Sequence, residues 1–180
     1  VGGEVTPHHL LLTDEACETY DTRAKMNPPL REESDRRALV EGVADGTITI
    51  LATDHAPHAT ESKEVDFASA SFGIVGLEGA LPLYAEALVA SGAIEWPRLI
   101  GMMTAEPAKL HGLDRIGLGR LAESGPADVV VIDPAMPWTI DPERFETLGR
   151  NSPFAGRAVV GRATHTIVAG EIRFELDAAD

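Results

Sequence analysis

The sequence predicts an α/β fold built on a parallel sheet, followed by a small unit of β-strands. Helical and extended patterns alternate as far as about residue 116. The stretch 47–53 is typical of a strand buried on both faces, and short apolar runs separated by Gly, Pro and Asp follow Gly117. Hydrophobic residues make up 44% of the 180 residues, which is enough for a real core.

The first elements are expected in this order. Residues 4–12 form a short strand that ends in a loop, because β-branched residues precede Pro7 and an apolar run follows it. Thr13 is a candidate cap for a helix start, and the consecutive prolines at 28–29 predict a loop. Residues 31–43 form a charged amphipathic helix.

The strand at 47–53 ends at Asp54, and a polar loop covers residues 59–71. Apolar residues then recur at helical spacing from 73 to 90, and one or two short helices are expected within 96–110. The expected core positions of the 73–90 helix are Leu77, Ala80, Leu81, Tyr84 and Leu88. Strand patterns follow at 129–132, 158–160, 164–168 and 171–176.

The chain is acidic, with 29 Asp and Glu residues against 15 Lys and Arg and a formal net charge of −14. This charge repels phosphate backbones and anionic lipids, so neither nucleic acid nor a membrane is an expected partner. A small anionic substrate remains compatible, because a few local cations dominate inside a pocket. Lys63 is expected to be solvated and Arg31 structural. A single cysteine, Cys17, and no apolar run of membrane length predict a cytoplasmic protein without disulfides.

Candidate chemistry concentrates in the segment Thr53-Asp54-His55-Ala56-Pro57-His58. A carboxylate at the C-terminal end of a buried parallel strand stands where α/β proteins place their sites, so Asp54 is a candidate metal ligand or base. His55 and His58 add imidazoles that bind metals or anions. By spacing alone, a structural interpretation weighs equally: Asp54 caps a turn, His55 is a buried hydrogen-bonded residue and His58 lies at the surface.

Residues 52–58 closely resemble the last-strand signature of the dihydroorotase branch of the amidohydrolase superfamily. Residues 103–109, 125–132 and 150–156 also match, so the resemblance covers essentially the whole chain. Three further segments agree with the family in order and spacing, namely Glu4-Val5-Thr6-Pro7-His8-His9-Leu10, Lys25-Met26-Asn27-Pro28-Pro29-Leu30-Arg31 and Phe72-Gly73-Ile74-Val75-Gly76-Leu77-Glu78.

The resemblance implies the C-terminal part of a (β/α)₈ TIM-barrel metal-dependent hydrolase over residues 1–116. Most of a small β-sandwich-like domain would follow over residues 117–180. A complete barrel needs about 250 residues, so we expect the last part of a longer fold whose partner strands are missing. The start at Val1 rather than Met suggests a cut edge.

The resemblance also implies roles for five residues. Asp54 would be the last carboxylate of the metal site and the catalytic acid/base. Asn27 and His58 would bind the substrate, as would the backbone at Phe72 and Gly73. An imidazole suits a substrate carboxylate because it forms a charge-assisted hydrogen bond, and a carboxamide offers both a donor and an acceptor to a cyclic amide.

One or two zinc ions are implied as cofactors. The other ligands of the family pattern would lie upstream of Val1: a His-x-His pair, a bridging carboxylate or carboxylated lysine, and two further histidines. We expect His8 and His9 to pack rather than ligate, because successive residues of a strand point to opposite faces. No role is expected for His111 or His165.

The implied activity is that of a dihydroorotase, the reversible hydrolysis of (S)-dihydroorotate to N-carbamoyl-L-aspartate in pyrimidine biosynthesis. A hydantoinase or allantoinase activity is one alternative, although Asn27 and the Phe72-Gly73 pair favour dihydroorotase. A non-catalytic dihydroorotase-like structural or regulatory partner is another, motivated by the missing metal ligands. A small-molecule substrate is expected, and both a homo-oligomer and a transcarbamoylase partner stay open.

Overall fold

The structure, a computed structural model, describes residues 2–177, which contain two separate sheets. In the first sheet, β1 (Gly3–Val5) pairs in parallel with β2 (Ile48–Leu51). The helix α2 (Glu33–Asp45) precedes β2 and ends at Gly46, whose φ of 90° is the left-handed conformation that favours glycine. The predicted buried strand is thus confirmed, with shorter bounds than expected.

The prediction for residues 4–12 was wrong in its second half. After β1 the chain forms a short helix, α1 (Pro7–Leu11), rather than a loop. Proline is well suited to the first turn of a helix, where its fixed φ is helical and its missing N–H would have no intrahelical partner. His8 and His9 therefore lie on a helix, and the argument that they point to opposite faces of a strand does not apply.

The predicted 73–90 helix begins seven residues late. Residues 73–76 instead contribute backbone contacts, including a parallel bridge between His55 and Ile74. The helical part consists of α3 (Ala80–Tyr84) and a π-helical continuation (Ala85–Ala90). Leu77 was wrongly placed in the core, because its side chain lies before the helix and is 58% exposed. Ala80, Tyr84 and Leu88 are buried as expected, with Leu81 packed against them.

The helices α4 (Trp96–Met103) and α5 (Ala105–Leu110) confirm the two short helices expected within 96–110. Among residues 2–177 no helix has both the length and the apolar character needed to cross a membrane. The 3₁₀ helices are Asp14–Cys17, Thr22–Ala24, Thr60–Ser62, Leu113–Ile116 and Pro142–Arg144.

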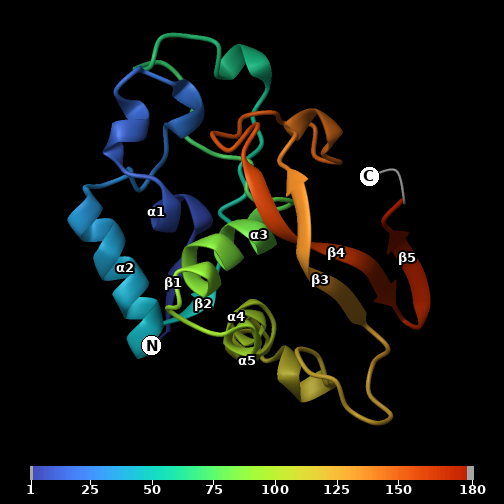
Figure 1. Ribbon diagram of the computed structural model, residues 1–180. Helices are drawn as coiled ribbons and strands as arrows, with labels where there is room; N and C mark the ends of the chain where they lie inside the picture. The colour runs from blue at the N-terminus through green and yellow to red at the C-terminus, as the bar shows by residue number, and fades with distance from the viewer. Residues whose placement is uncertain (1, 178–180) are drawn as a thin grey trace.

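The second sheet is antiparallel and has the order β3-β4-β5, with β3 spanning Val129–Thr139, β4 Ala158–Val168 and β5 Glu171–Glu175. It lies on the side of the molecule away from α1 and α2 and confirms the predicted unit of β-strands (Figure 1). The described residues form one layer here. Several of its apolar side chains are exposed, among them Val130, Val160, Ile172 and Phe174.

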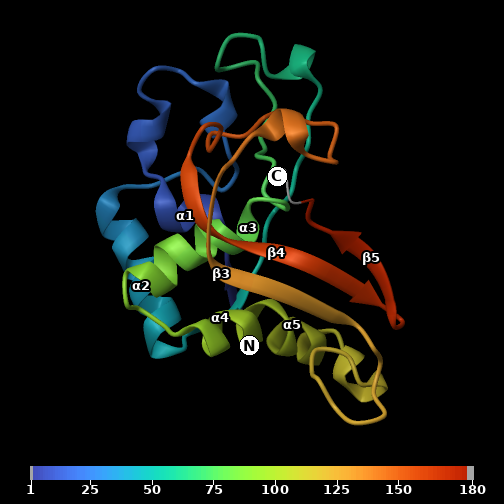
Figure 2. The same ribbon diagram turned by 45° about the vertical axis from the view of Figure 1, so that its right-hand side comes forward.

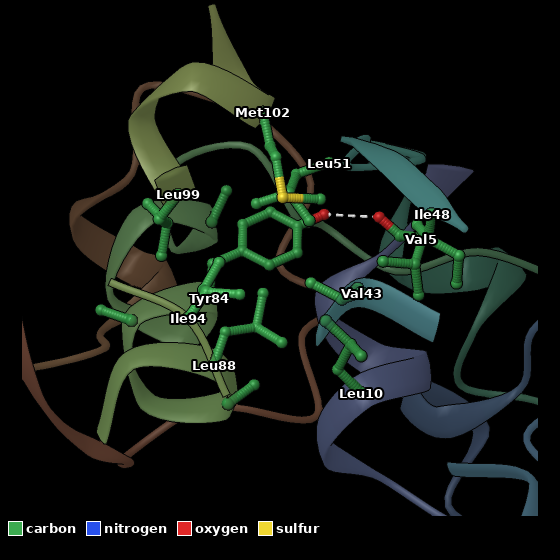
Figure 3. Close-up of a cluster of buried hydrophobic side chains, with 13 residues drawn as sticks. Val5, Leu10, Val43, Ile48, Leu51, Tyr84, Leu88, Ile94, Leu99 and Met102 are labelled. Atoms are coloured by element: carbon green, nitrogen blue, oxygen red, sulfur yellow. Dashed lines mark hydrogen bonds between the residues drawn. The ribbon is translucent and has the colours of Figure 1, made fainter. Parts of the chain in front are cut away.

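The main core lies between the first sheet and the helices, and Tyr84 stands at its centre (Figure 3). The Tyr84 ring is fully buried, and its hydroxyl contacts the backbone oxygen of Val5 at 2.8 Å and that of Ala52. These two carbonyls stand at the C-terminal ends of β1 and β2. Burial raises the pKa of the phenol, so the hydroxyl keeps its proton and can act as the donor. The side chain thus ties together the two strand ends that face the loops.

Replacing Tyr84 by Phe should lower the free energy of unfolding by about 1–2 kcal/mol, because buried carbonyl groups lose their donor while the ring is retained. Denaturant titration would measure this change. Tyr20→Phe is the matched control, since the Tyr20 side chain is 75% exposed and should be replaceable without loss. Equal stabilities of the two variants would contradict the role given to the Tyr84 hydroxyl.

Candidate functional site

The loops that follow β1 and β2 gather at one end of the molecule, together with the segment 141–157 that precedes β4 (Figures 1 and 2). Parallel pairing of the two strands brings their carboxyl ends to the same edge of the sheet. Thr22 Oγ1 donates to the carbonyl of Lys63 at 2.6 Å and so joins the first loop to the second. The expected site residues all lie in or beside these loops.

Asp54 lies three residues after the end of β2 and has a left-handed conformation, with a φ of 46°. A non-glycine residue in this region is uncommon, and such strain concentrates at functional positions. The Asp54 side chain is exposed and has no hydrogen-bond or ion-pair partner among residues 2–177. Its carboxylate is therefore available to a ligand, and it does not cap the following turn.

His55 has a structural role. Its Nδ1 accepts hydrogen bonds from the backbone N–H groups of Gly76 and Leu77 at 3.3 and 3.1 Å. An Nδ1 that accepts leaves the proton on Nε2, which contacts Thr147 Oγ1 at 3.2 Å and donates to it. The hydrogen-bonded interpretation of His55 is confirmed, and the side chain joins three loop segments.

His58 is half-buried and its ring is aimed at the Phe72–Gly73 segment. Nε2 lies 2.7 Å from the carbonyl oxygen of Phe72, which can only accept, so Nε2 donates and carries the proton. Nδ1 has no partner within the described part of the chain. The backbone N–H of His58 donates to Asn151 Oδ1 at 2.9 Å, which fixes the residue from its other side.

Gly73 is required by this close approach. Its φ is 141°, and a Cβ atom placed on it would lie 2.7 Å from the Ala56 Cβ and 2.8 Å from His58 Nε2. Both distances are shorter than atoms tolerate, so any side chain at this position would push the His58 ring away. The close approach of the His58 imidazole therefore explains why residue 73 is a glycine.

Asn27 lies in a loop held by neighbouring groups rather than by its own side chain, which is exposed and has no partner among residues 2–177. His9 Nε2 donates to the carbonyl of Pro28 at 3.0 Å, and Thr6 Oγ1 lies 2.7 Å from His9 Nδ1. The carbonyl of Lys25 accepts from the N–H of Gly73 at 3.0 Å. The Asn27 loop is thus attached both to α1 and to the Phe72–Gly73 segment.

A cleft of about 680 Å³ opens beside His58. Of the five residues expected in the site, His58 lines this cleft, whereas Asp54 and Asn27 lie on adjoining segments. The cleft is lined by Tyr20, Asp21, Thr22, Arg23, His58, Thr60, Lys63, Glu64, Val65, Glu143, Arg150 and Asn151.

Sequence reasoning missed two buried polar residues of the site. Lys63, expected to be solvated, is only 5% exposed, and Nζ donates to the carbonyls of Ser71 and Gly73 at 2.8 and 3.0 Å. Burial, together with the positive charge of Lys25, lowers the pKa of Lys63 to about 8. Asn151 is 4% exposed and binds both the His58 and the Gly73 backbone. No periodicity marks either residue, because their partners are distant backbone groups.

The described residues do not form a metal site by themselves. No group of three or more His, Cys, Asp and Glu side chains within residues 2–177 has an arrangement that could hold a metal ion. The His8 and His9 rings are tilted by 51° relative to each other with 4.5 Å between their centroids, and His9 contacts Thr6 and Pro28. Asp54 is a carboxylate at this edge that has no partner among residues 2–177 and could act as one ligand.

The family of the chain follows from comparison with known proteins. Residues 7–173 match the amidohydrolase family. The chain belongs to this family. Among curated relatives, a dihydroorotase of Anaeromyxobacter dehalogenans is 51% identical over 100% of this chain, and a dihydroorotase of Elusimicrobium minutum is 46% identical over 97%. The chain spans about 40% of the length of these relatives, at 41% and 40% respectively.

Solved structures of amidohydrolase relatives share the fold. The L-hydantoinase (dihydropyrimidinase) of Arthrobacter aurescens superposes with a TM-score of 0.90 at 32% identity, over 97% of this chain and 39% of the hydantoinase. The D-hydantoinase (dihydropyrimidinase) of a Thermus species gives a TM-score of 0.86 at 28% identity, over 96% and 39%. The chain is thus an α/β member of a TIM-barrel superfamily, as the family resemblance implied.

His8 generates a prediction about pH. Its side chain is 1% exposed and its Nε2 has no hydrogen-bond partner among residues 2–177. Burial, together with the adjacent His9, lowers the pKa of His8 to about 3. In the unfolded chain a histidine titrates near pH 6.5. Between these two values the unfolded state binds a proton that the folded state does not. The resulting stability is fully present above pH 6.5 and is lost as the pH falls towards 3.

His8→Leu should therefore weaken the loss of stability on acidification. The difference in denaturation midpoint between pH 7 and pH 5 is the quantity to compare, since it removes any constant effect of the substitution on packing. The single-group slope is at most about 1.4 kcal/mol per pH unit. An identical acid sensitivity in wild type and His8→Leu would show that His8 does not contribute.

Proposed function

We propose that this chain is the C-terminal portion of a dihydroorotase, which hydrolyses the cyclic amide of dihydroorotate reversibly to N-carbamoyl-aspartate. The observation that carries the proposal is the 51% identity, over the whole chain, to a relative named dihydroorotase, against 32% to a structurally similar hydantoinase. The loops support it, because an unpaired carboxylate, an unpaired carboxamide and an imidazole lie on connected segments of one sheet edge.

The proposal assigns residues 1–116 to the end of the barrel and residues 117–180 to a small β-sandwich-like domain. The exposed apolar side chains of β3, β4 and β5 support the second assignment, since a sandwich would cover them with another layer. The relatives are more than twice as long as this chain, which leaves room for the remaining barrel strands.

Asp54 is proposed as the acid/base of the reaction and as one ligand of a divalent metal site, with zinc as the expected ion. The remaining ligands would have to come from outside residues 2–177. A metal in this position would supply an activated water. Asp54 suits proton transfer because its carboxylate is exposed, unpaired and held by a strained backbone at the strand end.

Asn27, His58 and the backbone at Phe72 and Gly73 are proposed to hold the substrate. His58 Nδ1 has no partner among residues 2–177 while Nε2 donates to Phe72, so a proton on Nδ1 would create a cationic donor for the substrate carboxylate. Asn27 retains both its donor and its acceptor groups for the amide edge of the ring. A homo-oligomer or a transcarbamoylase partner remains a hypothesis from the sequence resemblance.

The proposal is tested with the protein expressed from the complete reading frame that encodes this chain. Dihydroorotate should be turned over, and Asp54→Ala should lower kcat/KM by at least about a thousandfold, because proton transfer contributes about 10²–10⁴ and a metal ligand is lost with it. Ring opening is followed by ultraviolet absorbance, and the metal content of each variant by atomic absorption.

Hydantoin, assayed in parallel, decides between the two cyclic amides. Faster turnover of hydantoin than of dihydroorotate would favour the hydantoinase alternative. Asp114→Ala, in the 3₁₀ helix Leu113–Ile116, is a matched control because it removes an exposed carboxylate remote from the loops. Wild-type rates for Asp54→Ala would refute the role of this carboxylate.

His58→Ala should raise KM for dihydroorotate by about tenfold or more and lower kcat much less, since the loss of a charge-assisted hydrogen bond to the bound ring weakens ground-state and transition-state binding alike. His111→Ala, an exposed histidine after α5, serves as the control. Steady-state kinetics at saturating and limiting substrate separate the two constants. A fall in kcat with KM unchanged would point to a role in the chemical step instead.

A further inference from the structure

We propose that Lys63 and Asn151 are positioning residues that hold the Gly73 carbonyl from two sides and thereby set the Phe72–Gly73 backbone against His58. This inference rests on the proposed function, because it concerns the segment expected to bind the substrate. It adds two residues whose side chains bind backbone groups of the segments that carry His58, Phe72 and Gly73.

Hydrogen bonds hold both backbone groups of Gly73 in this arrangement. Its oxygen accepts from Lys63 Nζ at 3.0 Å and from Asn151 Nδ2 at 3.0 Å, which uses both lone pairs of a carbonyl. Its N–H donates to the carbonyl of Lys25 at 3.0 Å. Both backbone groups of Gly73 therefore have hydrogen-bond partners, and these fix its position.

Lys63 is an unusual choice for a purely structural contact. Its ammonium is buried without a carboxylate hydrogen-bonded to it, and it binds backbone oxygens of Ser71 and Gly73. Burying a charge in this way is costly unless the group is well solvated by protein dipoles. The contacts are short and local to the two residues that flank Phe72, so the ammonium acts on the segment that His58 also contacts.

Asn151 connects the same segment to the other side of His58. Its Nδ2 donates to the carbonyls of Ala56 and Gly73 at 2.9 and 3.0 Å, and its Oδ1 accepts from the N–H of His58. These three partners determine the orientation of the Asn151 carboxamide, because the two carbonyls require its NH₂ group and the N–H requires its oxygen. The Asn151 side chain, from the segment before β4, therefore binds the backbone on both sides of the His58–Gly73 contact.

A small displacement of Gly73 would be transmitted to the proposed substrate groups. His58 Nε2 already lies 2.8 Å from where a Cβ on Gly73 would stand, and it donates to Phe72. Freeing the Gly73 carbonyl would let the Gly73–Ile74 peptide turn, and the adjoining Phe72 carbonyl, which accepts from His58 Nε2, would shift with it. Misplacement of substrate-binding groups by about 1 Å is enough to weaken binding and rate substantially.

The test uses the complete reading frame and the variants Lys63→Met, Asn151→Leu and the double variant. Each single variant should raise KM for dihydroorotate by about tenfold while kcat stays within about threefold. Amide hydrogen exchange of peptides covering residues 71–76 should accelerate in both, because the segment loses its anchors. The double variant should be less than additive, since both side chains act on one carbonyl.

Two controls separate positioning from general damage. Lys109→Met removes an exposed lysine that pairs with Glu106 on α5. Ser152→Ala alters the buried neighbour of Asn151, whose hydroxyl accepts from the N–H of Phe154. Both controls should leave KM and the exchange of residues 71–76 at wild-type values. If Lys63→Met gives too little folded protein, Lys63→Gln replaces it and should show a smaller increase in both quantities.

Unchanged exchange and KM in folded Lys63 and Asn151 variants would overturn the inference, and so would fully additive effects in the double variant. The exchange measurement needs no substrate. A wild-type protein that fails to turn over dihydroorotate would therefore count against the proposed function alone, whereas wild-type exchange in the variants would count against the positioning role alone.

Discussion

The site depends on the parallel pairing of β1 and β2, because this pairing sends both following loops to the same edge of the sheet. The pairing is short, and the Tyr84 hydroxyl strengthens it from within the core by contacting the carbonyls at both strand ends. The polar contacts between the following loops depend on the positions of these strand ends. A shift of one strand by a single residue would turn its side chains to the opposite faces and disperse the loop contacts.

Above the strand ends, the loops are held by side chains that contact backbone rather than by a regular ladder. Lys25 and Lys63 each bind two carbonyls of the segment 68–73, and Asn151 binds the Gly73 carbonyl of this segment and two backbone groups of the segment 56–58. Such contacts compensate buried peptide groups that no strand or helix can satisfy. They leave the side chains of Asp54 and Asn27 unpaired, so this edge combines a rigid backbone with available functional groups.

Much of the architecture could be predicted from local patterns. Val129–Ile132 and the apolar runs of β4 indicated strands without any tertiary information, and the β-branched stretch before Asp54 indicated a buried strand. The failures have two causes. Pro7 begins a helix because proline suits the first helical turn, which is a local preference. Leu77 lies outside a helix and residues 73–76 are not helical, because this segment bonds to His55 and Asn151, which are distant in the sequence. The spacing of apolar residues along the sequence does not indicate such distant backbone partners.

By itself, the sequence determined the α/β class, the position of the acidic strand end and the likeness to a hydrolase family, because these depend on residue type and spacing along the chain. Only the tertiary structure decided that Lys63 is buried, that His55 is structural while His58 faces Phe72, and that Gly73 must lack a side chain. These properties depend on which groups meet in space, and burial and hydrogen bonding exist only once residues 25, 58, 73 and 151 have been brought together.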